Sequence, residues 1–299
     1  MNKWVAYLNG EFIPEDETKI SIFDRGWLYG DGCFETLRVF KRKVCELGEH
    51  IDRLFKSLNA LKFHTFQMTK EEVEKAVLET CRRNKVKDAF LRINVSRGIS
   101  KYPLLDVRVA ETPTIAIFLR EVEPPPKMKR TYRSEKGVGL RVITSRMRKI
   151  PSISIDARIK SLNYLNSVLA IQEALEMNKD DAIMVSIDGY VTEMTGSNIL
   201  MVKNNNIYTP PPANMLIGIT RQIIIELAKV DGYKAEEKRL TPYDFHTADE
   251  VFVTSSGSGL RPVIEIDNVI IGTGEPGPIT LKLQGLFVNY REKTGTPYE

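Results

Sequence analysis

The sequence predicts an α+β protein built of two domains. Its 299 residues exceed what one hydrophobic core usually fills, and strand-like and helix-like patterns are mixed along its length. The stretch EVEPPPKMKR at residues 121–130 places three consecutive prolines among charged residues, which suits neither a helix nor a central strand. We therefore expect a small N-terminal domain over residues 1–120, a linker over 121–130 and a larger C-terminal domain over 131–299.

The chain is expected to begin with a β-hairpin. Strand-like residues 4–8 and 11–13 flank Asn9 and Gly10. This dipeptide is suited to the two positive φ angles of a type I′ turn, so the two strands should pair directly.

Glycines interrupt the next part of the chain. Gly26, Gly30 and Gly32 precede an aromatic and β-branched strand expected over residues 33–40, and we expect no helix across them. They either mark turns or let a ligand approach the backbone, and both interpretations stay open.

Two helices and two strands complete the first domain. Residues 49–63 place their apolar side chains on one helical face, and Thr69 with Glu72 forms a capping box at the start of a second helix. Strands are expected over residues 89–96 and 113–119. Together with the hairpin they predict a largely antiparallel sheet.

The second domain is expected to alternate hairpins and helices in the same way. Its predicted strands cover residues 139–144, 182–187, 190–193, 199–202, 207–209 and 250–254, with a hairpin over 263–271. Its predicted helices cover residues 161–177, 219–230, 241–246 and 279–290.

Composition and charge argue against several classes of partner. The 43 basic and 39 acidic residues give a net charge of +4, too even to indicate nucleic acid. No apolar run approaches the roughly 20 residues that span a bilayer, and the first residues lack the apolar segment of a secretory signal. Cys33, Cys45 and Cys81 lack zinc-site and C-x-x-C spacing. We expect a cytoplasmic protein with buried or free thiols and no metal site.

Lys160 is the candidate for covalent chemistry. It precedes an apolar-periodic segment, where an amine held against a core would be desolvated and more nucleophilic than a surface lysine. A Schiff-base lysine requires this property. Lys160 alone does not establish it, because most lysines are solvated surface charges.

Three further features could surround a phosphorylated, flat ligand. Residues 218–221 enter a predicted helix, whose free N–H groups favour a phosphate. Residues 253–259 leave a strand in a turn of small residues that can aim hydroxyls and amides at an anion. Glu193 ends a strand and is followed by small and polar residues. Taken singly, each feature also has an ordinary structural explanation.

As an ordered set, these stretches resemble the class IV aminotransferases, the fold type IV enzymes that use pyridoxal 5′-phosphate. The family includes branched-chain aminotransferases, D-amino-acid aminotransferases and aminodeoxychorismate lyases. The resemblance implies a larger C-terminal cofactor-binding domain with a barrel-like sheet. One departure is Leu200, where the family usually has an aromatic residue. The motifs that carry the resemblance are YLNGEFI, DRGWLYGDGCFETLRVF, EHIDRL, IKSLNYLN, VTEMTGSN, LIGITR and EVFVTSSGSGLRPV.

The resemblance implies a role for each matching residue. Lys160 would hold the cofactor as an internal aldimine and move the proton between substrate and cofactor. Arg53 would pair with the phosphate, Glu193 would keep the pyridine nitrogen protonated, and Tyr164 would hydrogen-bond the ring oxygen. The other phosphate contacts would come from two backbone amides and a hydroxyl, those of Ile219, Thr220 and Ser256.

Substrate motifs within the family point in more than one direction. The aromatic-x-Arg pattern of Phe90 and Arg92 is typical of branched-chain members, which favours a branched-chain L-amino acid. The threonine at position 36 resembles the residue found in the lyase branch. The DRGWLYGDG stretch resembles the corresponding stretch of D-amino-acid enzymes. In an enzyme of that kind, Arg97 or Lys101 could bind the substrate carboxylate. Tyr29, Phe34 and Phe90 are expected to line an apolar pocket for the substrate side chain. Arg92, the turn at Ser256 and Gly257, and Tyr29 are expected to bind the substrate α-carboxylate.

The resemblance also implies the reaction and the partners. We expect ping-pong transamination between an amino acid and a 2-oxo acid such as 2-oxoglutarate, a site at the domain interface, and a homodimer. A protein of another class, which binds the cofactor without catalysis, would keep the same scaffold.

Overall fold

The computed structural model describes residues 4–122, 132–134 and 137–299. Its contacts group the chain into two compact units. Unit 1 comprises Met1–Glu123, Ile159–Asn163 and Arg291–Glu299, and unit 2 comprises Pro124–Arg158 and Tyr164–Tyr290. Most of the expected linker, residues 123–130, lies outside the described residues. Two short segments from the C-terminal half of the sequence thus belong with the N-terminal unit.

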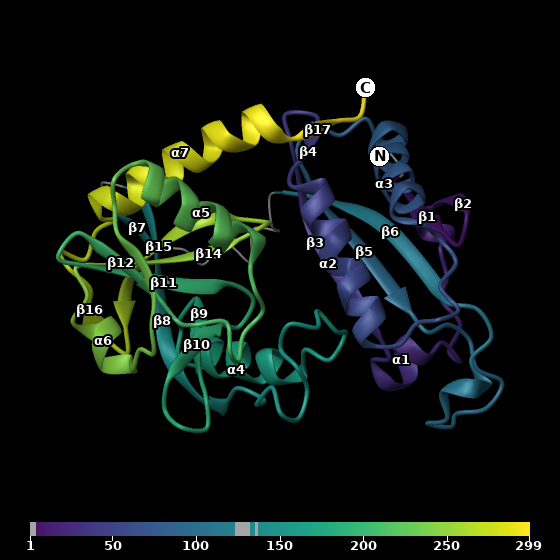
Figure 1. Ribbon diagram of the computed structural model, residues 1–299, viewed down its shortest axis with the longest axis horizontal. Helices are drawn as coiled ribbons and strands as arrows, with labels where there is room; N and C mark the ends of the chain where they lie inside the picture. Colours follow the sequence, from purple (N-terminus) through teal and green to yellow (C-terminus); the bar gives the residue numbers. More distant parts are fainter. Residues whose placement is uncertain (1–3, 123–131, 135–136) are drawn as a thin grey trace. The chain divides into compact units, whose positions relative to one another are not determined.

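Unit 1 contains a seven-stranded antiparallel sheet with the strand order β17-β4-β3-β5-β6-β1-β2 (Figure 1). The expected hairpin is present, since Asn9 and Gly10 have φ angles of 49° and 102° between β1 and β2. The strands are β1 (Val5–Leu8), β2 (Glu11–Pro14), β3 (Gly32–Phe40), β4 (Lys43–Val44), β5 (Ala89–Ser96), β6 (Thr114–Glu121) and β17 (Thr296–Pro297).

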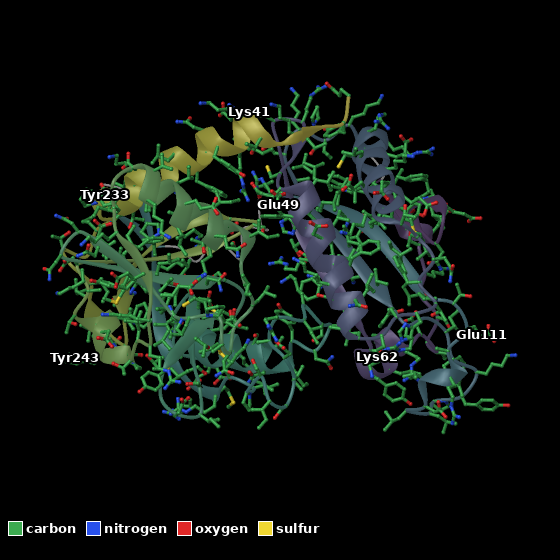
Figure 2. All side chains as sticks on the ribbon, viewed as in Figure 1. Lys41, Glu49, Lys62, Glu111, Tyr233 and Tyr243 are labelled. Atoms are coloured by element: carbon green, nitrogen blue, oxygen red, sulfur yellow. The ribbon has the colours of Figure 1, made fainter. Side chains whose placement is uncertain are left out.

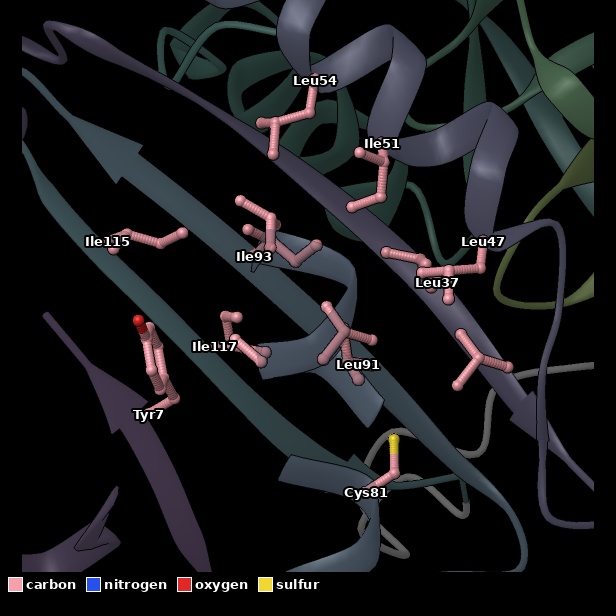
Figure 3. Packing of buried hydrophobic residues seen from close by; sticks show 14 of the residues in the cluster. Tyr7, Leu37, Leu47, Ile51, Leu54, Cys81, Leu91, Ile93, Ile115 and Ile117 are labelled. Atoms are coloured by element: carbon pink, nitrogen blue, oxygen red, sulfur yellow. The ribbon is translucent and has the colours of Figure 1, made fainter. Parts of the chain in front are cut away.

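Two amphipathic helices contribute to the core of unit 1. They are α2 (Leu47–Ala60) and α3 (Lys70–Asn84), and the expected capping box of Thr69 and Glu72 begins α3. Glu49 in the first turn of α2 and Lys62, two residues after its end, are exposed (Figure 2). The core side chains that α2 and the sheet contribute are shown in Figure 3 and include Leu47, Ile51, Leu54, Leu37, Leu91, Ile93, Ile115 and Ile117.

The side-chain alternation of β3 and β5 separates two faces of this sheet. Cys33 and Leu37 belong to the buried core cluster, and Glu35 shares their face because successive side chains alternate. Phe34 and Thr36 point to the opposite face. They pair with Asn94 and Arg92 of β5, respectively, so this second face carries aromatic and polar groups.

The glycine-rich stretch departs from the expectation of no helix. A five-residue helix, α1 (Arg25–Tyr29), forms across Gly26 because Asp24 caps it through the Gly26 amide at 2.8 Å. Gly30 ends it with a φ angle of 64°. Gly32 allows close packing instead, since a Cβ there would lie 2.4 Å from the Val95 carbonyl oxygen.

Unit 2 contains a ten-stranded mixed sheet, curled and barrel-like as expected (Figure 1). Strands β8 and β9, β8 and β15, and β12 and β13 are parallel neighbours, while the other pairs are antiparallel. The strands are β7 (Tyr132–Ser134), β8 (Gly137–Arg148), β9 (Asp181–Val185), β10 (Val191–Met194), β11 (Asn198–Lys203), β12 (Asn206–Thr209), β13 (Ala235–Glu237), β14 (Glu250–Ser255), β15 (Gly259–Ile266) and β16 (Val269–Ile270).

Helices α5 (Ile219–Val230) and α7 (Pro278–Thr294) pack on this sheet. Leu200, where the family usually has an aromatic residue, is fully buried in the cluster they share with Phe252. The Glu250 carboxylate of β14 accepts the amides of Ile279 and Thr280 at 3.0 and 2.8 Å. It therefore caps the N-terminus of α7 from the adjacent strand.

The expected helix over residues 161–177 begins later than predicted. Helix α4 is Leu165–Glu176, with Tyr164 at its N-cap. The other expected short helix, α6, is present at Pro242–His246. Ser161 instead forms a bridge to Cys33, and the Leu162 amide donates to the Gly32 carbonyl at 2.9 Å. These backbone bonds hold the residues after Lys160 extended alongside β3.

Two observations concern the expected cellular setting. Among the described residues, no helix combines the length and apolar character needed to span a membrane. All three cysteines are buried and unpaired. Burial, followed by the charge of Glu35, raises the pKa of the Cys33 thiol to about 12, so this sulfur is not a nucleophile at neutral pH.

Candidate active site

Lys160 is held to unit 1 by its backbone. Its carbonyl accepts the Phe34 amide at 2.9 Å, and its amide donates to Ser57 Oγ of α2 at 3.3 Å. The half-buried side chain places Nζ 4.3 Å from the centroid of the Phe34 ring. The amine therefore lies against an aromatic surface with its main chain fixed on both sides.

Arg53 lies on α2 and makes a bidentate pair with Glu35 of β3. Its Nε and Nη2 donate to the two carboxylate oxygens at 2.7 Å each, and His50 Nδ1 lies 2.7 Å from Glu35 Oε2. Burial alone would raise the pKa of Glu35, but Arg53 and His50 outweigh it and hold that pKa at about 2. Glu35 is therefore ionised at neutral pH and orients Arg53.

Arg92 shares the Phe34 ring with Lys160. Its guanidinium carbon lies 3.3 Å from the ring centroid, while Nε donates to Asn94 Oδ1 at 2.7 Å and Nη1 to Thr36 Oγ1 at 3.2 Å. Phe90 is two residues away on the same face of β5. Phe34 thus contacts Lys160 and Arg92, and Phe90 lies on the same face of the sheet with its ring 5.4 Å from the Arg38 guanidinium.

The structure places Arg97 and Tyr29 in a separate network within unit 1. Arg97 Nε donates to both Asp31 oxygens, at 3.1 and 2.9 Å, and Nη2 donates to the Leu61 carbonyl at 2.9 Å. The ring of Tyr29 lies 5.1 Å from the guanidinium of Arg25. Lys101, the other candidate carboxylate partner, is exposed and pairs with Glu111 at 3.4 Å. These Arg97 contacts hold Asp31 and the end of α2 together.

The N-terminus of α5 in unit 2 has the properties of an anion site. Gly218 is its N-cap, where no side chain caps the helix, and Ile219 and Thr220 follow in the first turn. Thr220 Oγ1 and Thr254 Oγ1 of β14 are buried, without a hydrogen-bond partner among the described residues. A Cβ on Gly218 would lie 1.9 Å from Asn198 Oδ1, so the close backbone approach requires glycine.

The other predicted cofactor contacts of unit 2 lie at ends of its elements. Ser256 and Gly257 form the half-exposed turn between β14 and β15. Tyr164 is the N-cap residue of α4. Glu193 lies on β10, where its Oε2 accepts the Leu216 amide at 3.2 Å and its Oε1 pairs with Lys149 Nζ at 2.5 Å.

Sequence reasoning missed Glu35, His50 and Lys149. A signal existed for the first, because Glu35 occupies a core-facing position of a strand whose neighbours Cys33 and Leu37 are apolar, and a buried carboxylate needs a partner. His50 is three residues from Arg53 on the same helix. Lys149 follows a strand with no comparable pattern.

These groups fit pyridoxal 5′-phosphate. The coenzyme needs an amine, an anion site for its phosphate and a carboxylate for its ring nitrogen. Within unit 1, Lys160 offers an amine. Within unit 2, the N-terminus of α5, with the Thr220 hydroxyl that has no partner among the described residues, suits a phosphate, and Glu193 offers a carboxylate. Each unit by itself thus offers part of what a pyridoxal-phosphate enzyme of fold type IV requires.

Comparison with known proteins identifies the family. Residues 32–266 match the model of amino-transferase class IV. A putative branched-chain-amino-acid aminotransferase of Methanocaldococcus jannaschii is 42% identical over 290 residues, 97% of either chain. A D-alanine aminotransferase of Bacillus licheniformis is 34% identical over 283 residues, 94% of this chain and 95% of the relative. The chain belongs to the class IV aminotransferases and is a pyridoxal-phosphate-dependent aminotransferase.

A solved structure supports the fold over its whole length. The T.th. branched-chain amino acid aminotransferase with pyridoxamine 5′-phosphate has a TM-score of 0.91 and 28% identity, with 100% of both chains covered. The expected fold type and family are confirmed.

Proposed function

We propose that this enzyme transfers the amino group of a branched-chain L-amino acid to a 2-oxo acid such as 2-oxoglutarate, with the coenzyme bound covalently to Lys160. The observation that carries the proposal is the Phe34 ring, which lies 4.3 Å from Lys160 Nζ and 3.3 Å from the Arg92 guanidinium. An amine and a carboxylate partner on one apolar wall suit an amino acid with an apolar side chain. The 42% identical relative carries the name of a branched-chain enzyme.

Bound pyridoxal phosphate supplies the electron sink for negative charge that develops at the substrate Cα. Lys160 would supply the amine that holds the coenzyme and would move the Cα proton as a general base and acid. Arg53 binds the phosphate in the orientation set by Glu35. Glu193 holds the proton of the ring nitrogen.

The remaining proposed contacts position the two ligands. Tyr164 donates to the ring oxygen of the coenzyme, and Phe34 and Phe90 line the side-chain pocket. Arg92 binds a carboxylate of the substrate, because a guanidinium matches carboxylate geometry. The phosphate is further bound at the N-terminus of α5 and the turn after β14, by Ile219, Thr220 and Ser256.

A half-reaction with each amino donor tests the proposal. The purified holoenzyme is mixed with L-leucine, D-alanine, D-glutamate or (R)-1-phenylethylamine, and the absorbance band of the lysine-bound coenzyme is followed. Rapid loss of the band with L-leucine alone is the expected result. Loss with D-amino acids alone would overturn the branched-chain assignment, and a band that no donor changes would indicate a non-catalytic binding protein.

A D-amino-acid transaminase is the second candidate. The D-alanine aminotransferase of Bacillus licheniformis matches nearly the whole chain, and the DRGWLYGDG stretch is similar to that group. In this alternative, Arg97 or Lys101 would have to exchange its present partner, Asp31 or Glu111, for a substrate carboxylate. That exchange would break a salt bridge of 2.9 or 3.4 Å, which makes the branched-chain proposal the better supported one.

We further propose a homodimer that uses an apolar surface of unit 1. This surface comprises exposed side chains of two segments, residues 20–27 and 99–107, among which Trp27 of α1 and Leu105 are 76% and 78% exposed. Arg25 fixes the second segment by donating to the carbonyls of Leu104 and Leu105 at 2.6 and 3.0 Å. A rigid, exposed apolar surface favours association. The side chains are Ile20, Ile22, Phe23, Trp27, Ile99, Tyr102, Leu104, Leu105 and Val107.

Sedimentation of the holoenzyme tests the dimer. The wild type is expected to sediment as a dimer, and Trp27→Ser with Leu105→Ser is expected to shift it toward monomer. An unchanged dimer in the double variant would place the interface elsewhere. The three unpaired cysteines support a reducing compartment, so we place the enzyme in the cytoplasm.

A further inference from the structure

Glu193 has a cationic partner, Lys149, to which the proposed function assigns no role. Lys149 Nζ lies 2.5 Å from Glu193 Oε1, and both side chains are mostly buried, at 16% and 9% exposure. The other oxygen of Glu193 accepts the Leu216 amide at 3.2 Å. The carboxylate is therefore shared between a charged and a neutral donor within unit 2.

Two strand irregularities bring this pair together. The pairing of β8 with β9 shifts register between Thr144 and Arg148, and that of β10 with β9 shifts between Val191 and Glu193. After the first shift, the Lys149 amide donates to the Val185 carbonyl of β9 at 2.9 Å. After the second, Glu193 pairs with Met184 of β9. Bulges re-aim side chains and are frequent beside active sites.

We propose that Lys149 is a positioning residue that weakens the hold of Glu193 on the proton of the coenzyme ring nitrogen. The proposal rests on the proposed function, in which Glu193 faces that nitrogen. An ammonium 2.5 Å from a poorly exposed carboxylate offsets much of its negative charge, since attraction is stronger away from water. The groups placed against Glu193 include Lys149 from the segment after β8, the Leu216 amide from the segment before α5, and Met184, its pairing partner on β9.

The expected consequence concerns the strength of the electron sink. A protonated ring nitrogen draws charge from the substrate Cα more strongly than a neutral one. With Lys149 present, the nitrogen releases its proton at a lower pH than Glu193 alone would allow. Lys149 thus sets the pH range over which the ring is protonated, without touching the reacting atoms.

The test reads the ring nitrogen directly. Holoenzyme is reconstituted with pyridoxal phosphate that carries 15N in the ring, and the 15N chemical shift is followed as pH is varied. Lys149→Met is expected to raise the midpoint of this titration by about one pH unit, which corresponds to roughly a tenfold change in proton affinity. Lys149→Arg, which keeps the charge, is expected to restore the wild-type midpoint.

Two further variants complete the design. Lys203→Met removes a lysine of unit 2 that pairs with Asp249 at 3.1 Å on the surface and is expected to leave the midpoint unchanged. Lys149→Gln removes the charge but keeps a polar side chain, so the test does not depend on the folding of Lys149→Met.

Different results would overturn the role of Lys149 and the proposed function. An unmoved midpoint in both Lys149→Met and Lys149→Gln, with coenzyme bound, would overturn the role of Lys149 alone. A wild-type protein that shows no bound coenzyme would overturn the proposed function and this inference with it.

Discussion

In unit 1, the charged groups of the candidate site are held by partners from the same unit, whereas in unit 2 buried hydroxyls are left without them. The Glu35 carboxylate accepts two bonds from Arg53 at 2.7 Å each. Thr220 Oγ1 and Thr254 Oγ1 have no partner within the described ranges. A buried polar group without a partner costs stability. The difference shows that Arg53 of unit 1 is oriented in advance, while the region around the N-terminus of α5 in unit 2 keeps hydroxyls available for a ligand. Glu193, elsewhere in unit 2, is paired in advance with Lys149.

Removal of the amine should have the largest effect. Lys160→Ala is expected to lower turnover by at least about 10⁴-fold, because no other group would attach the coenzyme and move the Cα proton. The variant should still bind pyridoxal phosphate, without the absorbance band of the lysine-bound form. Lys75→Ala, at an exposed lysine of α3 in the same unit, is the control. Ordinary turnover in Lys160→Ala would refute the assignment.

The pre-formed pair of unit 1 should appear in the pH dependence of stability. The pKa of Glu35 is about 2 in the folded protein against an ordinary 4.5. The ionised Glu35 carboxylate therefore stabilises the folded protein fully above about pH 4.5. As the pH falls toward 2, the free energy of unfolding decreases by about 3 kcal/mol. Glu35→Gln should lack this loss in denaturant unfolding.

The matched control is Glu49→Gln, which changes an exposed glutamate in the first turn of the same helix. Its acid unfolding should follow that of the wild type. If Glu35→Gln also follows the wild type between pH 5 and pH 2, the pair with Arg53 does not orient that arginine as described.

Substitutions of two arginines in unit 1 should have different effects, one on substrate binding and the other on stability. Arg92→Met is expected to raise KM for the 2-oxo acid by about 10-fold to 100-fold, the usual effect of a lost charged hydrogen bond. Arg97→Met should instead lower the melting temperature, since Arg97 bonds Asp31 and the Leu61 carbonyl. If steady-state kinetics show a raised KM for Arg97→Met and an unchanged KM for Arg92→Met, the substrate carboxylate binds Arg97 instead.

The smallest effect should come from an unpartnered hydroxyl of unit 2, and its sign should depend on the ligand. Thr220→Val is expected to leave the coenzyme-free protein equally or more stable, because a buried unpaired hydroxyl becomes a methyl group of similar size. It should weaken coenzyme binding by about 5-fold to 10-fold through loss of one hydrogen bond. Thermal melting without coenzyme and a coenzyme titration check the two halves. Equal binding by both proteins would remove Thr220 from the phosphate site.

Much of the fold could be predicted because its signals are local. Asn9 and Gly10 determine the turn of the first hairpin, and Thr69 with Glu72 determines where α3 begins. Only the β1–β2 and β3–β4 hairpins of the unit 1 sheet are such short pairings, while β1 with β6 and β3 with β5 pair over long sequence distances. The glycine-rich stretch was predicted less well, since the capping of Gly26 by Asp24 outweighs the low helix propensity of glycine.

The candidate site could be predicted only where family motifs cover it. Lys160, Arg53 and Glu193 are found in this way, and the structure places the first two in unit 1 and the third in unit 2. Lys149 could not be found, because its contact with Glu193 depends on two register shifts along β9. No sequence pattern reports such shifts.

The sequence by itself determined the order of the elements, the family and the chemical types at the site, because periodicity, turn residues and motifs act over a few residues. Only the tertiary structure decided which charges neighbour one another. Residues 160–162 lie extended along β3 rather than in a helix, since backbone bonds to Gly32 and Phe34 replace the helical ones. Long-range hydrogen bonds of this kind join residues more than 100 positions apart, and they place the Lys160 amine against Phe34.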